Sequence, residues 1–95
     1  MNITVVGSSS SGNGYIINTD SGTLLLECGM KLTKTEEALK YDLSDVVGLL
    51  VSHEHGDHAA YISDYIKHFN VYATEGTLIA RNMLEHRNAK VLKYG

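Results

Sequence analysis

Short apolar segments separated by polar turns dominate the first thirty residues. Residues 2–7 are rich in β-branched side chains and give way to a run of serines and glycines that favours an exposed loop. Two further apolar segments, residues 15–19 and 23–28, flank a turn at residues 20–22. The pattern predicts three strands, of which the second and third form a β-hairpin.

The middle of the chain changes to a helical pattern and then to a continuous apolar run. Thr33 and Glu36 have the spacing of a capping box, which predicts a short helix over residues 34–41. Residues 45–52 form an apolar run of strand length without polar alternation. Such a run is typical of an interior strand that is covered on both faces.

The last third of the chain alternates between helical and strand patterns. Four apolar residues recur with the spacing of one helical stripe, which predicts a helix from about residue 58 to residue 69. The stripe consists of Ile62, Tyr65, Ile66 and Phe69. Residues 71–74 then predict a strand, residues 77–86 a helix and residues 89–94 a final strand.

Composition places the chain among soluble globular proteins. Of its 95 residues, 43% are hydrophobic and 20% are charged, a balance that predicts a packed core rather than disorder. The formal charge of −3 argues against a broad basic face. We expect a cytoplasmic protein without a membrane span, because the sequence has neither a secretory signal nor a long apolar run, and Cys28 has no second cysteine to pair with.

Three histidines and two carboxylates fill the positions from His53 to His58, directly after the apolar run. Imidazole and carboxylate groups are good ligands for Zn²⁺, and a loop between a strand and a helix can hold them in fixed positions. A solvated loop with incidental histidines is the alternative. The ordered His-x-His-x-Asp-His spacing between two regular elements favours a metal site.

The residues around this cluster resemble a known family. The segment SHEHGDH, residues 52–58, is similar to the His-x-His-x-Asp-His signature of the metallo-β-lactamase superfamily. The segments GSSSSGNGYII, LLLECG and VYATEGT also resemble one branch of it, the YycJ/WalJ-type metallohydrolases of bacteria and phages. The resemblance extends over most of the chain.

The resemblance implies ligands for two zinc ions, although Mn²⁺ and Fe²⁺ can use the same residue types. By this likeness, His53 and His55 bind the first ion, while Asp57 and His58 bind the second. Asp57 is also the implied catalytic residue, which orients or deprotonates the attacking water. Glu27 stands where the family more often has aspartate and is implied to support the ligands from behind, a role that its longer side chain leaves open.

The fold implied by the resemblance is of the α+β class. It is the N-terminal half of a metallo-β-lactamase αββα sandwich, a mixed sheet with helices on one face. In the family, a third histidine, a bridging aspartate and a later histidine complete the site downstream, and residues 1–95 contain no matching positions. We therefore expect one partial domain without its C-terminal half, which needs a second half-domain or a homo-oligomer partner to cover its sheet.

The function implied by the branch is zinc-dependent hydrolysis by a phosphodiesterase or nuclease, with nucleic acid or a nucleotide as the substrate. A β-lactam or a thioester remains open as a substrate, because folds of this kind host many chemistries. The alternative from another class is a truncated, non-catalytic remnant or metal-binding module. It rests on the ligands that the sequence does not contain.

Other polar positions have structural explanations beside the functional ones. The serine-rich residues 8–13 predict either a cradle for an anion or a flexible turn. His68 and His86 fall in predicted helices, where an exposed polar face explains them. Glu54 is interpreted as a solvent-facing spacer or as a group that supports the ligands from outside, and Cys28 as a small buried hydrophobe.

Overall fold

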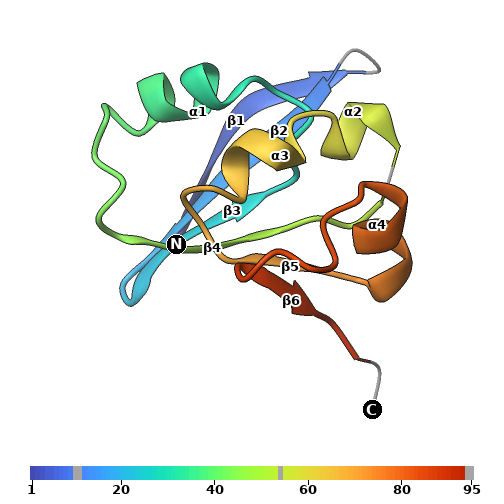
Figure 1. Cartoon of the computed structure of the whole chain (residues 1–95). Helices are drawn as coiled ribbons and strands as arrows, with labels where there is room; N and C mark the ends of the chain where they lie inside the picture. The colour runs from blue at the N-terminus through green and yellow to red at the C-terminus, as the bar shows by residue number, and fades with distance from the viewer. Residues whose placement is uncertain (10–11, 54, 94–95) are drawn as a thin grey trace.

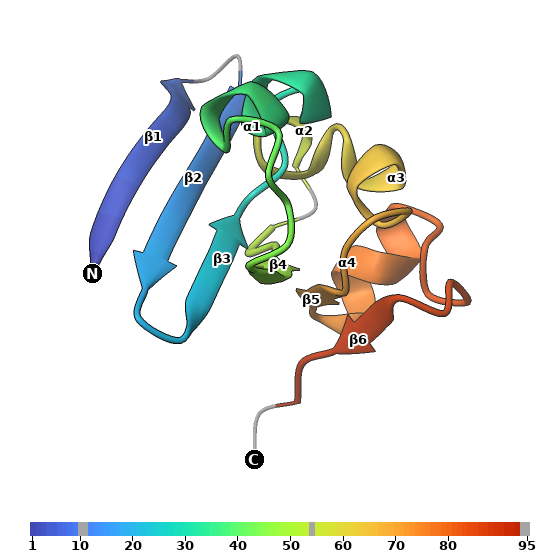
Figure 2. The same ribbon diagram turned by 90° about the vertical axis from the view of Figure 1, so that its left-hand side faces the viewer.

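A single mixed sheet organises the chain. The structure is a computed structural model that describes residues 1–9, 12–53 and 55–93, without the side chains of residues 56 and 57. Six strands follow one another across the sheet in sequence order (Figures 1 and 2). The strands are β1 (Asn2–Ser9), β2 (Gly12–Thr19), β3 (Gly22–Leu26), β4 (Val46–Leu50), β5 (Val71–Ala73) and β6 (Ala89–Val91).

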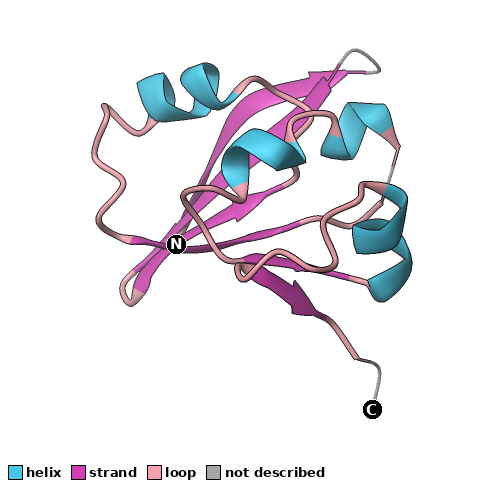
Figure 3. Cartoon of the chain, in the orientation of Figure 1, coloured by secondary structure: helices cyan, strands magenta, loops and turns pink. Residues whose placement is uncertain are grey.

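Four helices lie on one face of this sheet (Figure 3). They are α1 (Leu32–Ala38), α2 (Gly56–Ala59), α3 (Ile62–Tyr65) and α4 (Glu75–Ala80). The predicted class, a mixed α+β sheet with helices on one face, is confirmed. Among the described helices, none is long and apolar enough to cross a membrane.

The direction of pairing changes at β3, and this change places the histidine cluster. β1, β2 and β3 pair antiparallel, with the predicted hairpin closed at Thr19 and Gly22, whereas β3 to β6 pair in parallel. In the parallel β3–β4 ladder, Leu26 lies beside Leu50. Because parallel strands end at the same edge, the residues that follow β3 and β4 come out of the sheet side by side.

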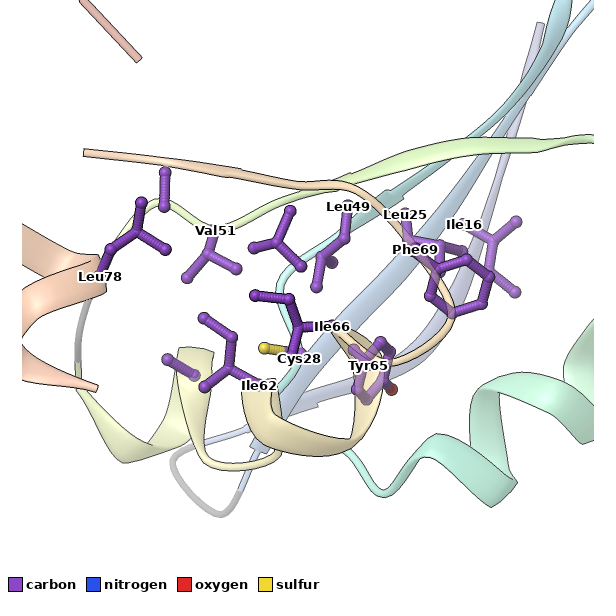
Figure 4. Close-up of a cluster of buried hydrophobic side chains, with 13 residues drawn as sticks. Ile16, Leu25, Cys28, Leu49, Val51, Ile62, Tyr65, Ile66, Phe69 and Leu78 are labelled. Carbon is purple, nitrogen blue, oxygen red and sulfur yellow. The ribbon is translucent and has the colours of Figure 1, made fainter. Parts of the chain in front are cut away.

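The core fills the space between the sheet and the helices (Figure 4). Leu49 and Val51 point from the sheet toward Ile62 and Ile66 on the helical side, and all four side chains are at most 2% exposed. The helical stripe predicted from the sequence is therefore the buried face of α3 and the turn after it. Val51 anchors the end of β4 immediately before the histidine cluster.

The opposite face of the sheet has no covering layer in the described chain. Ile3, Val5 and Val47 are between 57% and 60% exposed. The apolar run 45–52 does form an interior strand, but the prediction that it is covered on both faces is wrong. The cause is that all four helices pack on the other side of the sheet.

The helix predicted from residue 58 to residue 69 is interrupted. α2 ends at Ala59 and α3 begins at Ile62. The His58 carbonyl, which would accept from the residue-62 amide in a continuous helix, accepts from the Cys28 N–H at 2.7 Å, and the Tyr61 N–H donates to the Cys28 carbonyl at 3.0 Å. Backbone hydrogen bonds to the segment after β3 therefore replace the helical ones.

A second difference concerns the helix predicted over residues 34–41. The observed α1 starts earlier, with Lys31 as a cap residue that makes no side-chain cap hydrogen bond, so the predicted capping box at Thr33 is wrong. The N–H groups of Lys34 and Thr35 donate to the Lys31 carbonyl at 2.9 and 3.4 Å, so the first turn of the helix forms before Thr33 could act as a cap. The Thr35 hydroxyl is buried inside α1 and hydrogen-bonds the Tyr65 hydroxyl at 2.6 Å.

The helix predicted over residues 77–86 corresponds to α4, which begins earlier and is shorter than predicted. The Thr74 hydroxyl accepts a hydrogen bond from the Thr77 N–H at 3.2 Å, so α4 starts at Glu75. Beyond the end of α4, Asn82 has a φ of 58°, a left-handed conformation that commonly terminates helices.

Candidate metal centre

Glu27 is the first residue after β3, and its conformation directs its side chain into the site. Its φ is 65°, in the left-handed region, and the residue is only 6% exposed. Its N–H donates to the Leu50 carbonyl at 2.8 Å, which continues the pairing of β3 with β4. The backbone thus turns while it is still tied to the neighbouring strand.

The Glu27 carboxylate accepts three hydrogen bonds from the segment that follows β4. Its Oε1 accepts from the Ser52 N–H at 2.8 Å, and its Oε2 accepts from the Ser52 hydroxyl and from Nδ1 of His58, the latter at 2.9 Å. An ionised carboxylate can only accept, so His58 donates from Nδ1. This is the arrangement by which outer carboxylates orient metal-binding histidines.

Backbone contacts hold α2 against Glu27. The N–H groups of His58 and Ala59 both donate to the His55 carbonyl at 2.9 Å, which forms the first turn of α2. The 2.7 Å bond from the Cys28 N–H to the His58 carbonyl then joins the end of this turn to the residue after Glu27. Both the backbone and the side chain of His58 are therefore fixed relative to β3.

Glu27, His53 and His58 form a cluster that could hold a metal ion. Each offers a nitrogen or oxygen ligand atom, and these atoms lie within 4.8 Å of one another. The ring centroids of His53 and His58 are 4.7 Å apart, and the His58 side chain is 25% exposed. Zinc–nitrogen and zinc–oxygen bonds are about 2.0–2.2 Å long. Two ligands of one ion are therefore at most roughly 4.4 Å apart, so these groups must move slightly closer before all of them can share one divalent ion.

The structure describes some of the predicted metal ligands more fully than others. His53 and His58 come together, while His55 is exposed at the edge of the cluster, its ring centroid 6.1 Å from that of His53. The backbone of Asp57 lies in α2, but its side chain falls outside the described structure, as does residue 54. The assignment of His53, His55, Asp57 and His58 as ligands remains a prediction.

Ser52 is a site residue that sequence reasoning missed. Its N–H and its hydroxyl both contact Glu27, and its Oγ lies 2.7 Å from Nδ1 of His53. The available signal was its position between a buried strand and the first histidine. Only the parallel pairing of β3 with β4 shows that this position faces Glu27.

The other candidate residues are not members of the metal cluster that the described residues form. His68 is exposed, and Nδ1 of His86 accepts a hydrogen bond from the Asn88 N–H at 3.1 Å in the turn before β6. Cys28 is fully buried, as predicted, and burial together with the nearby Glu27 charge raises the pKa of its thiol to about 12. A thiol with so high a pKa is a poor ligand and a poor nucleophile at neutral pH.

Glycines around the serine-rich loop make room for Met30. A Cβ atom at Gly7 would lie 2.4 Å from the Met30 sulfur, and one at Gly12 would lie 2.5 Å from the Gly29 carbonyl oxygen. Residues 10 and 11 of the proposed anion cradle fall outside the described structure. Packing against the segment that follows Glu27 therefore accounts for these glycines.

Comparison with known proteins identifies similar sequences and folds. The family model described as the metallo-beta-lactamase superfamily matches residues 9–95. Exodeoxyribonuclease YycJ of Bacillus anthracis is 34% identical over 91 residues, which cover 90% of this chain and 33% of that protein.

Two solved structures are similar in fold. The metallo-beta-lactamase fold protein YhfI of Bacillus subtilis has a TM-score of 0.71 at 20% identity, over 98% of this chain and 45% of its own. The short form of human tRNase Z has a TM-score of 0.67 at 14% identity, over 96% of this chain and 42% of its own. The chain thus spans about a third of the curated relative and less than half of either structure.

Proposed function

Because the chain belongs to the metallo-β-lactamase superfamily, we propose that it forms part of a metal-dependent hydrolase that cleaves phosphodiester bonds in nucleic acid or a nucleotide. Its fold is that of the N-terminal part of the family's sandwich. The observation that carries the proposal is the convergence of Glu27, His53 and His58 at the shared end of two parallel strands. The nuclease names of YycJ and tRNase Z favour a nucleic acid substrate over a lactam or thioester.

The proposed ligands are His53 and His55 for one ion and Asp57 and His58 for a second. Zinc is the first candidate, because imidazole and carboxylate ligands suit it, and Mn²⁺ and Fe²⁺ are the alternatives. When bound, such ions act as Lewis acids on phosphoryl oxygens and make water nucleophilic at neutral pH. Glu27 contributes by holding the His58 ring in one orientation through Nδ1.

Asp57 is the proposed catalytic residue. It stands in the first turn of α2 between His55 and His58, so its backbone position is fixed by the same hydrogen bonds that hold His58. We assign it the task of orienting or deprotonating the attacking water, as a general base placed within hydrogen-bond reach of that water would.

The rest of the active site is proposed to come from outside the described chain. A second half-domain or a second copy would supply further ligands and cover the open face of the sheet, where Ile3, Val5 and Val47 are exposed. We place the protein in the cytoplasm, since its one cysteine, Cys28, is unpaired and buried.

The first test is bound metal per chain, measured by elemental mass spectrometry on protein purified without chelators. It is followed by hydrolysis assays with phosphodiester, thioester and lactam reporters. With a second half-domain supplied, we expect metal-dependent turnover of the phosphodiester, lost in Asp57→Asn and retained in the matched surface variant Asp64→Asn. Turnover of the lactam alone would overturn the proposed substrate.

A non-catalytic metal-binding module is the second candidate function. The observation behind it is that, among the described side chains, the metal cluster contains His53 and His58 but no other proposed ligand. Stoichiometric metal without turnover of any reporter, in the chain alone and with a supplied second half-domain, would select this candidate.

A further inference from the structure

We infer that Ser52 is a positioning residue that holds His53 in the neutral tautomer with its proton on Nδ1, so that Nε2 carries the lone pair for a metal ion. The inference rests on the proposed metal site and adds a residue to it. Ser52 itself does not contact the ion. It acts by connecting the buried Glu27 carboxylate to His53.

The direction of each hydrogen bond follows from the number of available protons. Ser52 has one hydroxyl proton, which it donates to Oε2 of Glu27, because a carboxylate can only accept. The Ser52 oxygen also lies 2.7 Å from Nδ1 of His53. With its proton already used, that oxygen must accept, so Nδ1 of His53 must be the donor.

The Ser52 hydroxyl is itself held rigidly. The Ser52 N–H donates to Oε1 of Glu27 at 2.8 Å, so backbone and side chain are tied to the same carboxylate. The preceding residue, Val51, is 1% exposed, and its N–H donates to the Tyr72 carbonyl at 3.0 Å. Because both its backbone and its hydroxyl are already fixed, Ser52 loses little conformational entropy when it orients His53.

One carboxylate thus orients two imidazoles by different routes. Glu27 reaches Nδ1 of His58 directly, at 2.9 Å, and reaches Nδ1 of His53 through the Ser52 hydroxyl. Both rings then carry the lone pair on Nε2, and their centroids are 4.7 Å apart. Through Ser52, the carboxylate that contacts His58 directly also orients His53.

The test uses the 95-residue chain and three variants: Ser52→Ala, which removes the hydroxyl, Ser52→Thr, which keeps it, and Ser63→Ala as the matched control. Ser63 lies exposed on α3. The first readout is ¹⁵N NMR of the imidazoles in metal-free protein at pH about 8.5, where free imidazole is neutral. The second is zinc affinity, measured by competition with a chromophoric chelator.

We expect the wild type, Ser52→Thr and Ser63→Ala to show protonated Nδ1 at His53, and Ser52→Ala to shift toward the Nε2-protonated tautomer. Zinc affinity should fall about 10- to 100-fold in Ser52→Ala, as is usual when an outer partner of a metal ligand is removed, and should return in Ser52→Thr. Circular dichroism should remain that of the wild type in all variants.

An unchanged His53 tautomer in Ser52→Ala would overturn the inference, and so would a tautomer shift with zinc affinity within about twofold of the wild type. A wild-type chain that binds no zinc would instead count against the proposed metal function. The NMR readout needs no metal, so these two failures are distinguishable.

Discussion

Glu27 combines a costly backbone conformation with the most connected side chain of the site. A residue other than glycine held at a φ of 65° is destabilised by about 1–3 kcal/mol and persists only where its surroundings fix it. Here the carboxylate accepts bonds from Ser52 and His58, and the backbone N–H remains tied to Leu50. The backbone strain therefore occurs at the residue whose carboxylate contacts both Ser52 and His58.

Replacing Glu27 with glutamine tests this role at nearly constant volume. The amide has a single oxygen, so its NH₂ group would face a donor from Ser52 or His58, which leaves a buried polar group unsatisfied. We expect the free energy of unfolding to fall by about 1–3 kcal/mol, and zinc affinity to fall about 10- to 100-fold.

Urea unfolding and metal titration measure these two losses. Glu37→Gln, on the exposed side of α1, is the control and should change neither quantity. A Glu27→Gln variant with wild-type stability and zinc affinity would show that the carboxylate does not orient the histidines.

Burial of two weak acids predicts sensitivity to alkaline pH. Burial raises the pKa of Cys28 from 9.0 to about 12 and that of Tyr65 from 10.0 to about 12. Between the unfolded and folded pKa values the unfolded chain has lost these protons and the folded chain keeps them, so the unfolded state is favoured. Stability should be full below pH 9 and should fall as the pH rises toward 12.

Urea unfolding at a series of pH values from 8 upward measures this loss. Tyr65→Phe and Cys28→Ala should each flatten part of the alkaline decline, although each lowers stability at neutral pH. A decline of unchanged steepness in both variants would contradict the assignment.

At the scale of the elements, hydrophobic periodicity predicted which faces are buried better than where helices end. Ile62 and Ile66 lie in the core as the stripe indicated, yet the helix that was to carry them breaks between α2 and α3. The break depends on two backbone hydrogen bonds of Cys28, some thirty positions away in the chain: its N–H donates to the His58 carbonyl, and its carbonyl accepts from the Tyr61 N–H. Local sequence pattern contains no information about such partners.

The same limit applies to the site. The histidine cluster was readable because its residues are neighbours in sequence, whereas the Glu27–Ser52 contact joins residues 25 positions apart. That contact exists because β3 and β4 pair in parallel with Leu26 beside Leu50. The family resemblance identified Glu27 but not the residues that its side chain contacts. Ser52 could be identified as one of these only from the fold.

His55→Ala tests whether the element that carries the ligands survives the loss of one of them. The His55 carbonyl, which accepts from His58 and Ala59, belongs to the backbone and is kept in the variant. We therefore expect α2 and the sheet to remain folded by circular dichroism, while ordered metal binding measured by elemental analysis is lost. His68→Ala, at an exposed position, should bind metal as the wild type does. Retained zinc in His55→Ala would mean that His55 is not a ligand.

At the scale of the whole molecule, the sheet has a helical layer on only one side within the part of the chain that the structure describes. Ile3 and Val5 lie on the open face of the edge strand β1, beside Ile17 and Tyr15 of β2. Soluble monomers rarely expose a continuous apolar surface of this kind, and an edge strand adds unpaired backbone groups. We therefore expect the open face to be a site of association for the isolated chain.

We expect the 95-residue chain to associate at tens of micromolar in light scattering. The double variant Ile3→Lys, Val5→Lys should weaken this association, because it places charges on the open face. Thr4→Lys is the control, since Thr4 pairs with Ile16 and shares its helix-covered face. A compact, stable wild-type monomer would show that the open face does not drive association.

The contact between Glu27 and His58 also closes a loop of 31 residues that contains α1 and β4. Closing such a loop costs chain entropy during folding, so any ligand that binds only the closed form favours the folded state. Zinc at 100 times its dissociation constant would add about 2.7 kcal/mol to the free energy of unfolding. The melting temperature should rise with zinc concentration in the wild type and stay constant in His55→Ala. The melting temperature would then report the fraction of chains that have bound zinc.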